Sequence, residues 1–314
     1  MSEQDDAGLD ADVIEQASRQ FSFPVISGLP SLSGITGTRR HWLMIIAAAG
    51  ALLVTAATLV TLRLAAGPRA DPALARLIRE VTTVPVGKSL PASASSASAY
   101  SSTLVIGAGS LTAVSGPPLT RDGKPEVLYV ATGYCPYCAM ENWPLIVALS
   151  RFGQFTGLTT SRSPKFEHIA PAGSWTFYGS HYTSPYLSFV PVEQYSNVLV
   201  NATANPDARQ SYRKLQQLTP AQQALFARYD KTRPVPFLDF GNHAAQAGSG
   251  PIPVQLMTGK SWQQLAAALR RPSTGLGAAL LTEADSLTAE LCRLTGDRPA
   301  SACPAFITSI QLPS

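Results

Sequence analysis

The chain has 314 residues, of which 45% are hydrophobic and 14% are charged, and its formal net charge is +4. This length leaves room for a sizeable domain with additional segments. The positive charge is small and dispersed, without a cluster of Lys and Arg interleaved with aromatic residues, so no nucleic acid is expected as a partner. The four cysteines fall into two pairs, which suits an oxidising compartment better than a reducing one.

The N-terminal residues 1–41 are polar and lack a long apolar periodicity, which predicts a disordered tail. Residues 42–64 then form an apolar run with no charged residue before Arg63. A helix of that length spans the roughly 30 Å hydrocarbon core of a bilayer, so we predict a single transmembrane helix. One alternative is a signal peptide cleaved near Ala65–Gly67, and another is a buried core helix, although the run has no polar face.

The flanking charges bear on the orientation of this helix. Arg39 and Arg40 precede it, and Arg63 and Arg69 lie on its C-terminal side, so the positive-inside rule gives only a weak preference. The cysteine pairs and the size of the C-terminal part favour a cytoplasmic N-terminus and an extracytoplasmic C-terminal domain. We therefore expect a single-pass protein of the cell membrane, and the inverted orientation is the alternative.

A linker is expected between the predicted membrane helix and the main domain. Residues 65–103 combine a short helix with a Ser/Ala-rich stretch that is typical of a tether. Asp71 is the expected N-cap of this helix and Pro72 its first residue. The main domain is predicted over residues 104–314.

The main domain is organised around residues 126–151. This stretch combines a short apolar strand, a turn, the motif Cys-Pro-Tyr-Cys at residues 135–138, and a helix. Two cysteines three residues apart at a helix N-terminus lie close enough to form a disulfide, and the helix dipole favours a thiolate on the first. We predict that Cys135 is an exposed attacking thiol and that Cys138 is a more buried resolving thiol.

A structural metal site and an inert disulfide are the other interpretations of this motif. A zinc site needs two further ligands at suitable spacing, but the histidines are scattered singly and Cys292 and Cys303 form no second motif of that kind. We therefore predict no metal and no cofactor. In an oxidising compartment we expect Cys292 and Cys303, beside a predicted helix over residues 282–294, to form a structural disulfide worth roughly 2–4 kcal/mol.

A long region, about residues 152–232, separates the motif's helix from the next strong signal. It contains aromatic-rich, strand-like segments and a predicted helix over residues 220–229. Its tyrosines are expected in the core more often than on a substrate surface. These tyrosines are Tyr178, Tyr182, Tyr186 and Tyr195. Val235 and Pro236 then precede an apolar strand that ends in a Gly-Asn turn.

The order of these elements resembles the thioredoxin superfamily. A strand, the Cys-Pro-Tyr-Cys motif, a helix, a proline before the strand FLDFGN, and a terminal helix follow one another. The resemblance implies an α/β, thioredoxin-like fold with a large insertion at about residues 152–232, preceded by the transmembrane helix. It also implies that Pro236 is a cis-proline facing the dithiol and that the backbone of Val235 pairs with an extended substrate.

From Gly123 onward the chain resembles the bacterial and archaeal domain-of-unknown-function family 929. The two blocks that carry this resemblance are GKPEVLYVATGYCPYCAMENWPLIVALSRFG and TFYGSHYTSPYLSFVPVEQY. Proteins of that family are thioredoxin-like and often anchored in a membrane. Thioredoxins also have a buried acid near the dithiol, for which Glu126 and Glu141 are the candidates, as a proton relay. A solvated helix face is the other interpretation of Glu141.

These inferences predict a membrane-anchored, extracytoplasmic thiol–disulfide oxidoreductase that exchanges disulfides with protein substrates. Tyr134 and Tyr137 are expected to shape the rim of its site. The family resemblance implies a membrane partner that recycles the dithiol, such as a quinone-linked disulfide oxidase. The alternative is a non-enzymatic thioredoxin-like binding or assembly module with a closed Cys135–Cys138 disulfide. Copper delivery ranks last, because a Met- or His-rich partner segment is missing from the sequence.

Overall fold

The structure is a computed structural model. It describes residues 71–87, 111–165, 168–229, 232 and 234–311. The predicted tail, the predicted transmembrane helix and the Ser/Ala-rich stretch lie outside these ranges. Among the described residues, no helix has the length and apolar character that crossing a membrane requires.

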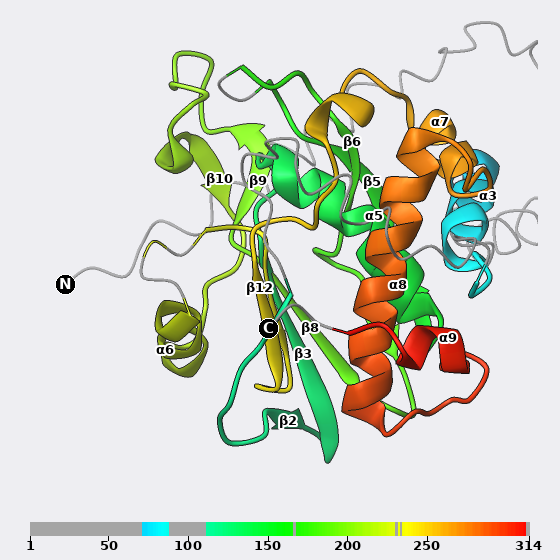
Figure 1. The fold of residues 1–314 in the computed structure, drawn as a ribbon. Coiled ribbons are helices and arrows are strands. Elements are labelled where there is room, and N and C mark those ends of the chain that lie inside the picture. Colours follow the sequence, from blue (N-terminus) through cyan, green and yellow to red (C-terminus); the bar gives the residue numbers. More distant parts are fainter. Residues whose placement is uncertain (1–70, 88–110, 166–167, 230–231, 233, 312–314) are drawn as a thin grey trace, which may run out of the picture. The chain divides into compact units, whose positions relative to one another are not determined.

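A mixed β-sheet forms the centre of the described domain (Figure 1). Its strands follow the order β1, β12, β11, β3 and β2, and β8 also pairs with β3. The β3–β8 pair is parallel, whereas β3–β11 and β11–β12 are antiparallel. The strands are β1 (Thr112–Ala113), β2 (Thr120–Arg121), β3 (Lys124–Ala131), β8 (Ser188–Glu193), β11 (Phe237–Phe240) and β12 (Ala244–Ala247).

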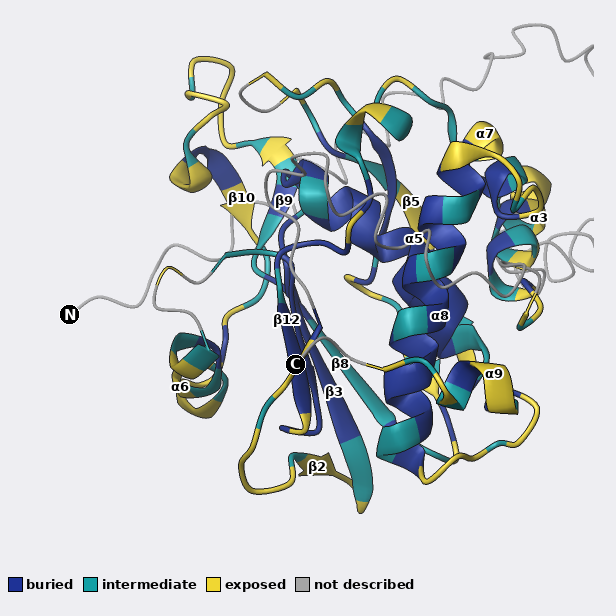
Figure 2. Ribbon diagram, in the orientation of Figure 1, coloured by how far each residue is buried: buried dark blue, intermediate teal, exposed yellow. Residues whose placement is uncertain are grey.

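The middle strand β3 is buried on both faces, as its near-continuous apolar run predicts. Val127 and Tyr129 point into the larger core cluster, which includes residues of the long helices described next. Leu128 and Val130 point into a second cluster on the other face, together with Phe226. Figure 2 shows most of β3 in the colour of buried residues, and β11 and β12 beside it are buried as well. Each fully buried aliphatic side chain of this kind contributes roughly 1.5–3 kcal/mol to folding.

Two long helices, α5 and α8, lie side by side on one face of the sheet (Figure 1). Arg151, at the end of α5, forms a buried ion pair of 2.8 Å with Asp285 of α8. Pro144 lies inside α5 without ending it. The helices are α3 (Pro72–Thr82), α5 (Pro136–Ser150), α6 (Pro220–Tyr229), α7 (Trp262–Ala268), α8 (Gly275–Thr295) and α9 (Ala305–Thr308), with short 3₁₀ turns η1 (Arg209–Ser211) and η2 (Val254–Leu256).

The region predicted as an insertion, residues 152–232, is built into the fold more deeply than expected. Its strand β8 is part of the central sheet, and six further strands form three two-stranded sheets, β4–β7, β5–β6 and β9–β10. These strands are β4 (Gln154–Thr156), β5 (Thr159–Arg162), β6 (Gly173–Thr176), β7 (His181–Thr183), β9 (Tyr195–Leu199) and β10 (Tyr212–Lys214). Only the two-stranded sheets and α6 are therefore additions to the central sheet.

The tyrosines of this region mostly serve the core, as the sequence favours. Tyr182, Tyr186 and Tyr195 are half-buried and pack against the larger core cluster. The Tyr182 hydroxyl donates a hydrogen bond of 2.8 Å to the Leu149 carbonyl at the end of α5. Tyr178 differs, because 49% of its surface is exposed.

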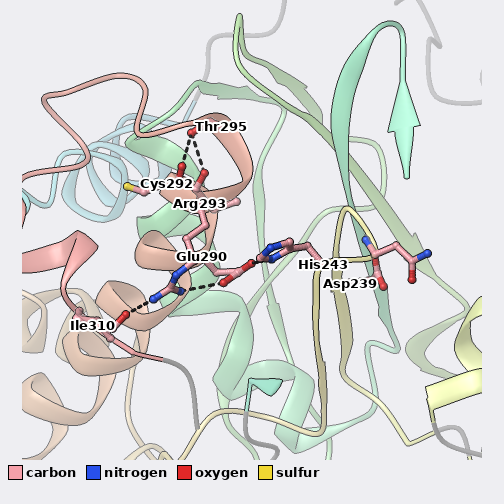
Figure 3. Close-up of polar contacts among 9 residues, drawn as sticks. Asp239, His243, Glu290, Cys292, Arg293, Thr295 and Ile310 are labelled. Carbon is pink, nitrogen blue, oxygen red and sulfur yellow. Dashed lines mark hydrogen bonds and ion pairs between the residues drawn. The ribbon is translucent and has the colours of Figure 1, made fainter. Parts of the chain in front are cut away.

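The end of α8 is tied to the sheet and to the C-terminal segment (Figure 3). The buried Glu290 contacts His243 of the β11–β12 turn at 3.0 Å and Arg293 at 2.9 Å. Arg293 also donates to the Ile310 carbonyl. In the last turn of α8, Cys292 forms a disulfide with Cys303, which lies just before α9. The sequence predicts this pairing, and it holds the loop that follows α8 against the helix.

Candidate active site

The motif at residues 135–138 joins the end of β3 to the start of α5. Cys135 is the N-cap residue of α5, and its sulfur accepts a hydrogen bond of 3.4 Å from the Cys138 backbone N–H. Pro136 occupies the first helical turn, where an N–H would have no partner within the helix. Both cysteines are free thiols. A strand therefore delivers the first sulfur to the positive end of a helix, as the motif predicts.

The α5 helix is held in place by polar contacts beneath the motif. Asn142 accepts a hydrogen bond of 2.6 Å from the Tyr129 hydroxyl and donates one of 2.7 Å to the Trp175 carbonyl. Trp143 donates a hydrogen bond of 3.0 Å to the Gly173 carbonyl. These buried contacts connect α5 to β3 and β6, so the position of the two sulfurs is fixed by three elements.

Both sulfur-bearing residues are buried, which corrects the expectation of an exposed Cys135. Cys135 is 6% exposed and Cys138 is 1% exposed. The predicted order of burial holds, but the first thiol is covered too, because the half-buried Val235 and Tyr137 pack onto the same cluster. The Cys135 side chain is therefore largely covered in this structure.

The two thiols differ in acidity despite their similar burial. Burial alone raises the pKa of Cys135, but hydrogen bonds from Cys138 and from the backbone of Cys138 and Tyr137, together with the charge of Arg209, outweigh it, so the pKa is lowered. Burial raises the pKa of Cys138 well above its ordinary value, and the neighbouring Cys135 adds to this effect. The arrangement therefore favours a thiolate on the first sulfur and a protonated thiol on the second.

The segment before β11 faces the first sulfur. The Val235–Pro236 peptide bond is cis. The Cys135 sulfur lies 3.5 Å from the Val235 carbonyl oxygen, to which it donates a weak hydrogen bond. The fold thus brings the predicted site residues Val235 and Pro236 to Cys135, although Val235 follows Cys135 by a hundred positions in the chain.

The two tyrosines expected at the rim lie in different places. Tyr134 is buried and stacks on Tyr212 of β10 with ring centroids 4.5 Å apart. Its hydroxyl also accepts a hydrogen bond of 3.3 Å from Arg209. Tyr137 is half-buried beside the core cluster. Tyr134 is therefore a packing residue that joins the motif to the β9–β10 sheet, and the expectation that it shapes the rim is wrong.

Glu126 does not lie near the dithiol. It is buried at the start of β3, where it forms an ion pair of 2.8 Å with Arg121. The cysteines follow the other end of this strand, which places about 16 Å of extended chain between the carboxylate and the motif. The hypothesis that Glu126 relays a proton to the thiols is therefore wrong.

Glu141 is buried rather than solvated, but its carboxylate bonds elsewhere. One oxygen accepts a hydrogen bond of 2.7 Å from the Gly250 N–H, and the other has no partner among the described residues. Burial raises the pKa of Glu141 to about 7, against the opposing hydrogen bond from Gly250. A second buried carboxyl group, Glu283 of α8, has a pKa raised well above its ordinary value by burial and by the charge of Glu141.

Sequence reasoning missed Glu193, a carboxylate whose charge acts on Cys138. It ends β8 opposite Ala131, the last residue of β3. Its oxygens accept hydrogen bonds of 2.7 Å from the Thr176 hydroxyl and 2.6 Å from the Phe177 N–H. Burial raises the pKa of Glu193, and its charge in turn contributes to the raised pKa of Cys138. Parallel strands end at the same edge of a sheet, so Glu193 could be placed near the motif only by pairing β8 with β3, which the sequence does not specify.

Sequence reasoning also missed Arg209. This exposed residue begins η1, and through its contact with Tyr134 it lies close enough to Cys135 to lower the pKa of that thiol. No local pattern marks it, since it lies in a polar loop between β9 and β10. Within the described part of the chain, no group of three or more His, Cys, Asp or Glu residues is arranged to hold a metal ion.

Comparison with known proteins gives a family and no named relative. No curated protein and no solved structure matches the chain. The model of the family described as a domain of unknown function (DUF929) matches residues 110–293, which span more than half of the chain and include the whole candidate site. The chain therefore belongs to the DUF929 family.

Proposed function

We propose that this protein is a thiol–disulfide oxidoreductase with a thioredoxin-like fold. The observation that carries the proposal is the pair of unequal thiols at the start of α5, with Cys135 facing the Val235 carbonyl at 3.5 Å. The strand order β12, β11, β3, β8, in which only β3 and β8 are parallel, supports the fold assignment. The positions of two helices in the chain also support it, because α5 directly follows β3 and α8 follows β12.

In the proposed reaction, the Cys135 thiolate attacks one sulfur of a substrate disulfide. A bond forms between Cys135 and that sulfur, and the other substrate sulfur leaves as a thiolate. Cys138 then loses its proton and attacks the Cys135 sulfur, which releases the second substrate thiolate and closes the Cys135–Cys138 disulfide. Two electrons pass to the substrate. In the reverse direction, a substrate dithiol reduces the same disulfide through the same bonds.

The proton of Cys138 needs an acceptor, and the carboxylate of Glu193 is proposed for this role in place of Glu126 and Glu141. A cavity of about 10 Å³, close to the size that holds one water, is lined by Thr132 and Glu193 among others. The Thr132 hydroxyl oxygen is buried and has no partner among the described residues. A water in this cavity would connect the carboxylate to the region of Cys138.

The proposed setting is extracytoplasmic, with the chain anchored through residues 42–64. The disulfide between Cys292 and Cys303 supports an oxidising compartment. Protein thiols and disulfides are the proposed substrates, and a quinone-linked membrane disulfide oxidase is the proposed recycling partner if the protein acts as an oxidant.

A second candidate function is a non-enzymatic binding or assembly module. The observation in its favour is that Cys135 is only 6% exposed, whereas reactive cysteines are typically partially exposed. In that case the Cys135–Cys138 pair would be a permanently closed disulfide, and the two-stranded sheets of residues 152–232 would carry the interaction.

The reduction potential of the Cys135–Cys138 pair distinguishes these functions. We would equilibrate the full-length chain with glutathione or dithiothreitol buffers and follow each cysteine by alkylation and peptide mass spectrometry, with Cys135→Ser as the control. A value between roughly −270 and −120 mV, with rapid alkylation of Cys135 at neutral pH, is expected of an exchange catalyst. A value below roughly −300 mV without thiol reactivity would refute catalysis and favour the binding module.

A further inference from the structure

A polar cavity of about 470 Å³ opens beside the motif. This volume lies within the roughly 300–1,000 Å³ range of ligand sites. The cavity is bounded by the β5–β6 sheet, by the β9–β10 sheet and by the loop that leads into the motif. Its lining includes Gly133, Ser161, Thr176, Asn197, Arg213 and Lys214. The elements that wall it on two sides thus come from the additions to the central sheet.

The cavity is connected to the dithiol by the chain itself. Gly133 lies two residues before Cys135, and its N–H donates a hydrogen bond of 2.7 Å to the Tyr195 carbonyl of β9. A side chain at Gly133 would meet the backbone of Asn197 at 2.9 Å, so the loop and β9 are in close contact. The stacking of Tyr134 on Tyr212 fixes β10 to the same loop. The cavity therefore extends to a residue that lies two positions before Cys135 in the chain.

The cavity carries unpaired positive charge. Arg213 and Lys214 are exposed, and neither forms an ion pair or a side-chain hydrogen bond with another described residue. Arg209 adds a third cation nearby, and between residues 201 and 214 the single acidic residue is the exposed Asp207. Cations that are held at a cavity without partners favour an anionic ligand.

The acidic residue in the cavity lining does not cancel this charge. Glu193 is 3% exposed, and both of its oxygens already accept hydrogen bonds, from Thr176 and Phe177. The hydroxyl and amide groups of the lining, together with the half-exposed Tyr178, suit a peptide, whose backbone offers donors and acceptors along its length.

We infer that this cavity binds an acidic segment next to the reacting cysteine of a protein substrate, with Arg213 as the principal cation. The inference rests on the proposed exchange function and adds the substrate class to it. It assigns the two-stranded sheets β5–β6 and β9–β10 a role in selecting substrates, separate from the sulfur chemistry that Cys135 and Cys138 perform.

The test compares two peptides that are identical except for three glutamates or three lysines beside one cysteine. Each cysteine is joined in a disulfide to a chromophoric thiol, whose release by the reduced full-length chain is followed at low ionic strength. We expect release from the acidic peptide to be about tenfold faster, and this preference to vanish in Arg213→Glu. Arg298→Glu, which reverses an exposed charge in the loop after α8, should keep the preference. Uncharged hydroxyethyl disulfide should be reduced at the same rate by the wild type, Arg213→Glu and Arg298→Glu.

A binding measurement separates this inference from the proposed function. The anisotropy of a fluorescent, cysteine-free acidic peptide reports occupancy of the cavity even if the thiols prove inert. Binding that is weakened about tenfold by Arg213→Glu and not by Arg298→Glu would support the site independently of catalysis. Equal rates for the acidic and basic peptides, or acidic-peptide binding that Arg213→Glu leaves unchanged, would overturn the site. If the wild-type protein bound the acidic peptide but showed no disulfide exchange, only the proposed exchange function would be overturned.

Discussion

The two cysteine pairs of this chain are both buried, yet they differ in state. Cys135 and Cys138 are free thiols at the start of α5, whereas Cys292 in the last turn of α8 forms a disulfide with Cys303. Cys135 lies at the positive end of a helix dipole, whereas Cys292 lies at a negative end, where a thiolate is disfavoured. Burial therefore does not distinguish the free thiols from the disulfide; the position on the helix and the neighbouring charges do.

The largest expected effect comes from removing the second pair. In the double variant Cys292→Ser, Cys303→Ser, we expect the free energy of unfolding to fall by about 2–4 kcal/mol, because the unfolded chain loses a crosslink that spans eleven positions. Unfolding of the oxidised full-length chain in urea, followed by circular dichroism, measures this change. The rate of disulfide exchange at 25 °C should stay within about twofold of the wild type, because Cys292 and Cys303 do not contact Cys135 or Cys138.

The matched control for that prediction is the same pair of measurements on Cys135→Ser. The free energy of unfolding of this variant should lie within about 1 kcal/mol of that of the wild type with Cys135 and Cys138 reduced and the Cys292–Cys303 disulfide intact. The variant should lose disulfide exchange entirely. If the Cys292 and Cys303 variant instead lost exchange while remaining folded, the separation between a reactive and a structural pair would be wrong.

The helices that carry the two pairs meet near two buried carboxyl groups, Glu141 of α5 and Glu283 of α8. The folded-state pKa of Glu141, about 7, is above the usual 4.5, so the folded chain keeps a proton that the unfolded chain loses. Stability on this account is complete below pH 4.5, falls as the pH rises toward 7, and stays low above it. Glu141→Gln should therefore raise the free energy of unfolding at pH 8, by at most about 3 kcal/mol, and change it little at pH 4.

Urea unfolding of Glu141→Gln at pH 4 and pH 8 tests this prediction. Glu80→Gln is the control, because Glu80 lies on the surface of α3 in an ion pair with Arg76, and a change within about 0.5 kcal/mol is expected at both pH values. A gain for Glu141→Gln that is equal at pH 4 and pH 8 would rule out proton linkage as its cause.

Local patterns in the sequence predict the elements around Cys135 and Cys138, but not the other side chains that surround them. The apolar run of β3, the motif and α5 are continuous in the sequence, so their periodicity and spacing are sufficient to place them. The position of Val235 followed from a resemblance in the order of elements. Glu193 and Arg209 could not be assigned in this way, because their proximity to the thiols depends on the parallel β3–β8 pairing and on the stacking of Tyr134 over Tyr212. Contacts between residues about 60 to 80 positions apart leave no periodic signal.

The smallest expected effect comes from Arg209. It tests whether this nearby charge or the start of α5 lowers the pKa of Cys135. Arg209 lowers the pKa of this thiol, so Arg209→Gln should raise that pKa and slow alkylation of Cys135 at pH 6 by about two- to fivefold, the range expected of an exposed charge. The difference from wild type should shrink in 1 M salt, since Arg209 is exposed and its field is screened. Alkylation rates across pH 5–9, measured with Arg298→Gln as the control, test both statements. Rates that match the wild type at low salt would assign the lowered pKa to the hydrogen bonds at the start of α5, and position on the helix alone would then distinguish this cysteine pair from the disulfide at the end of α8.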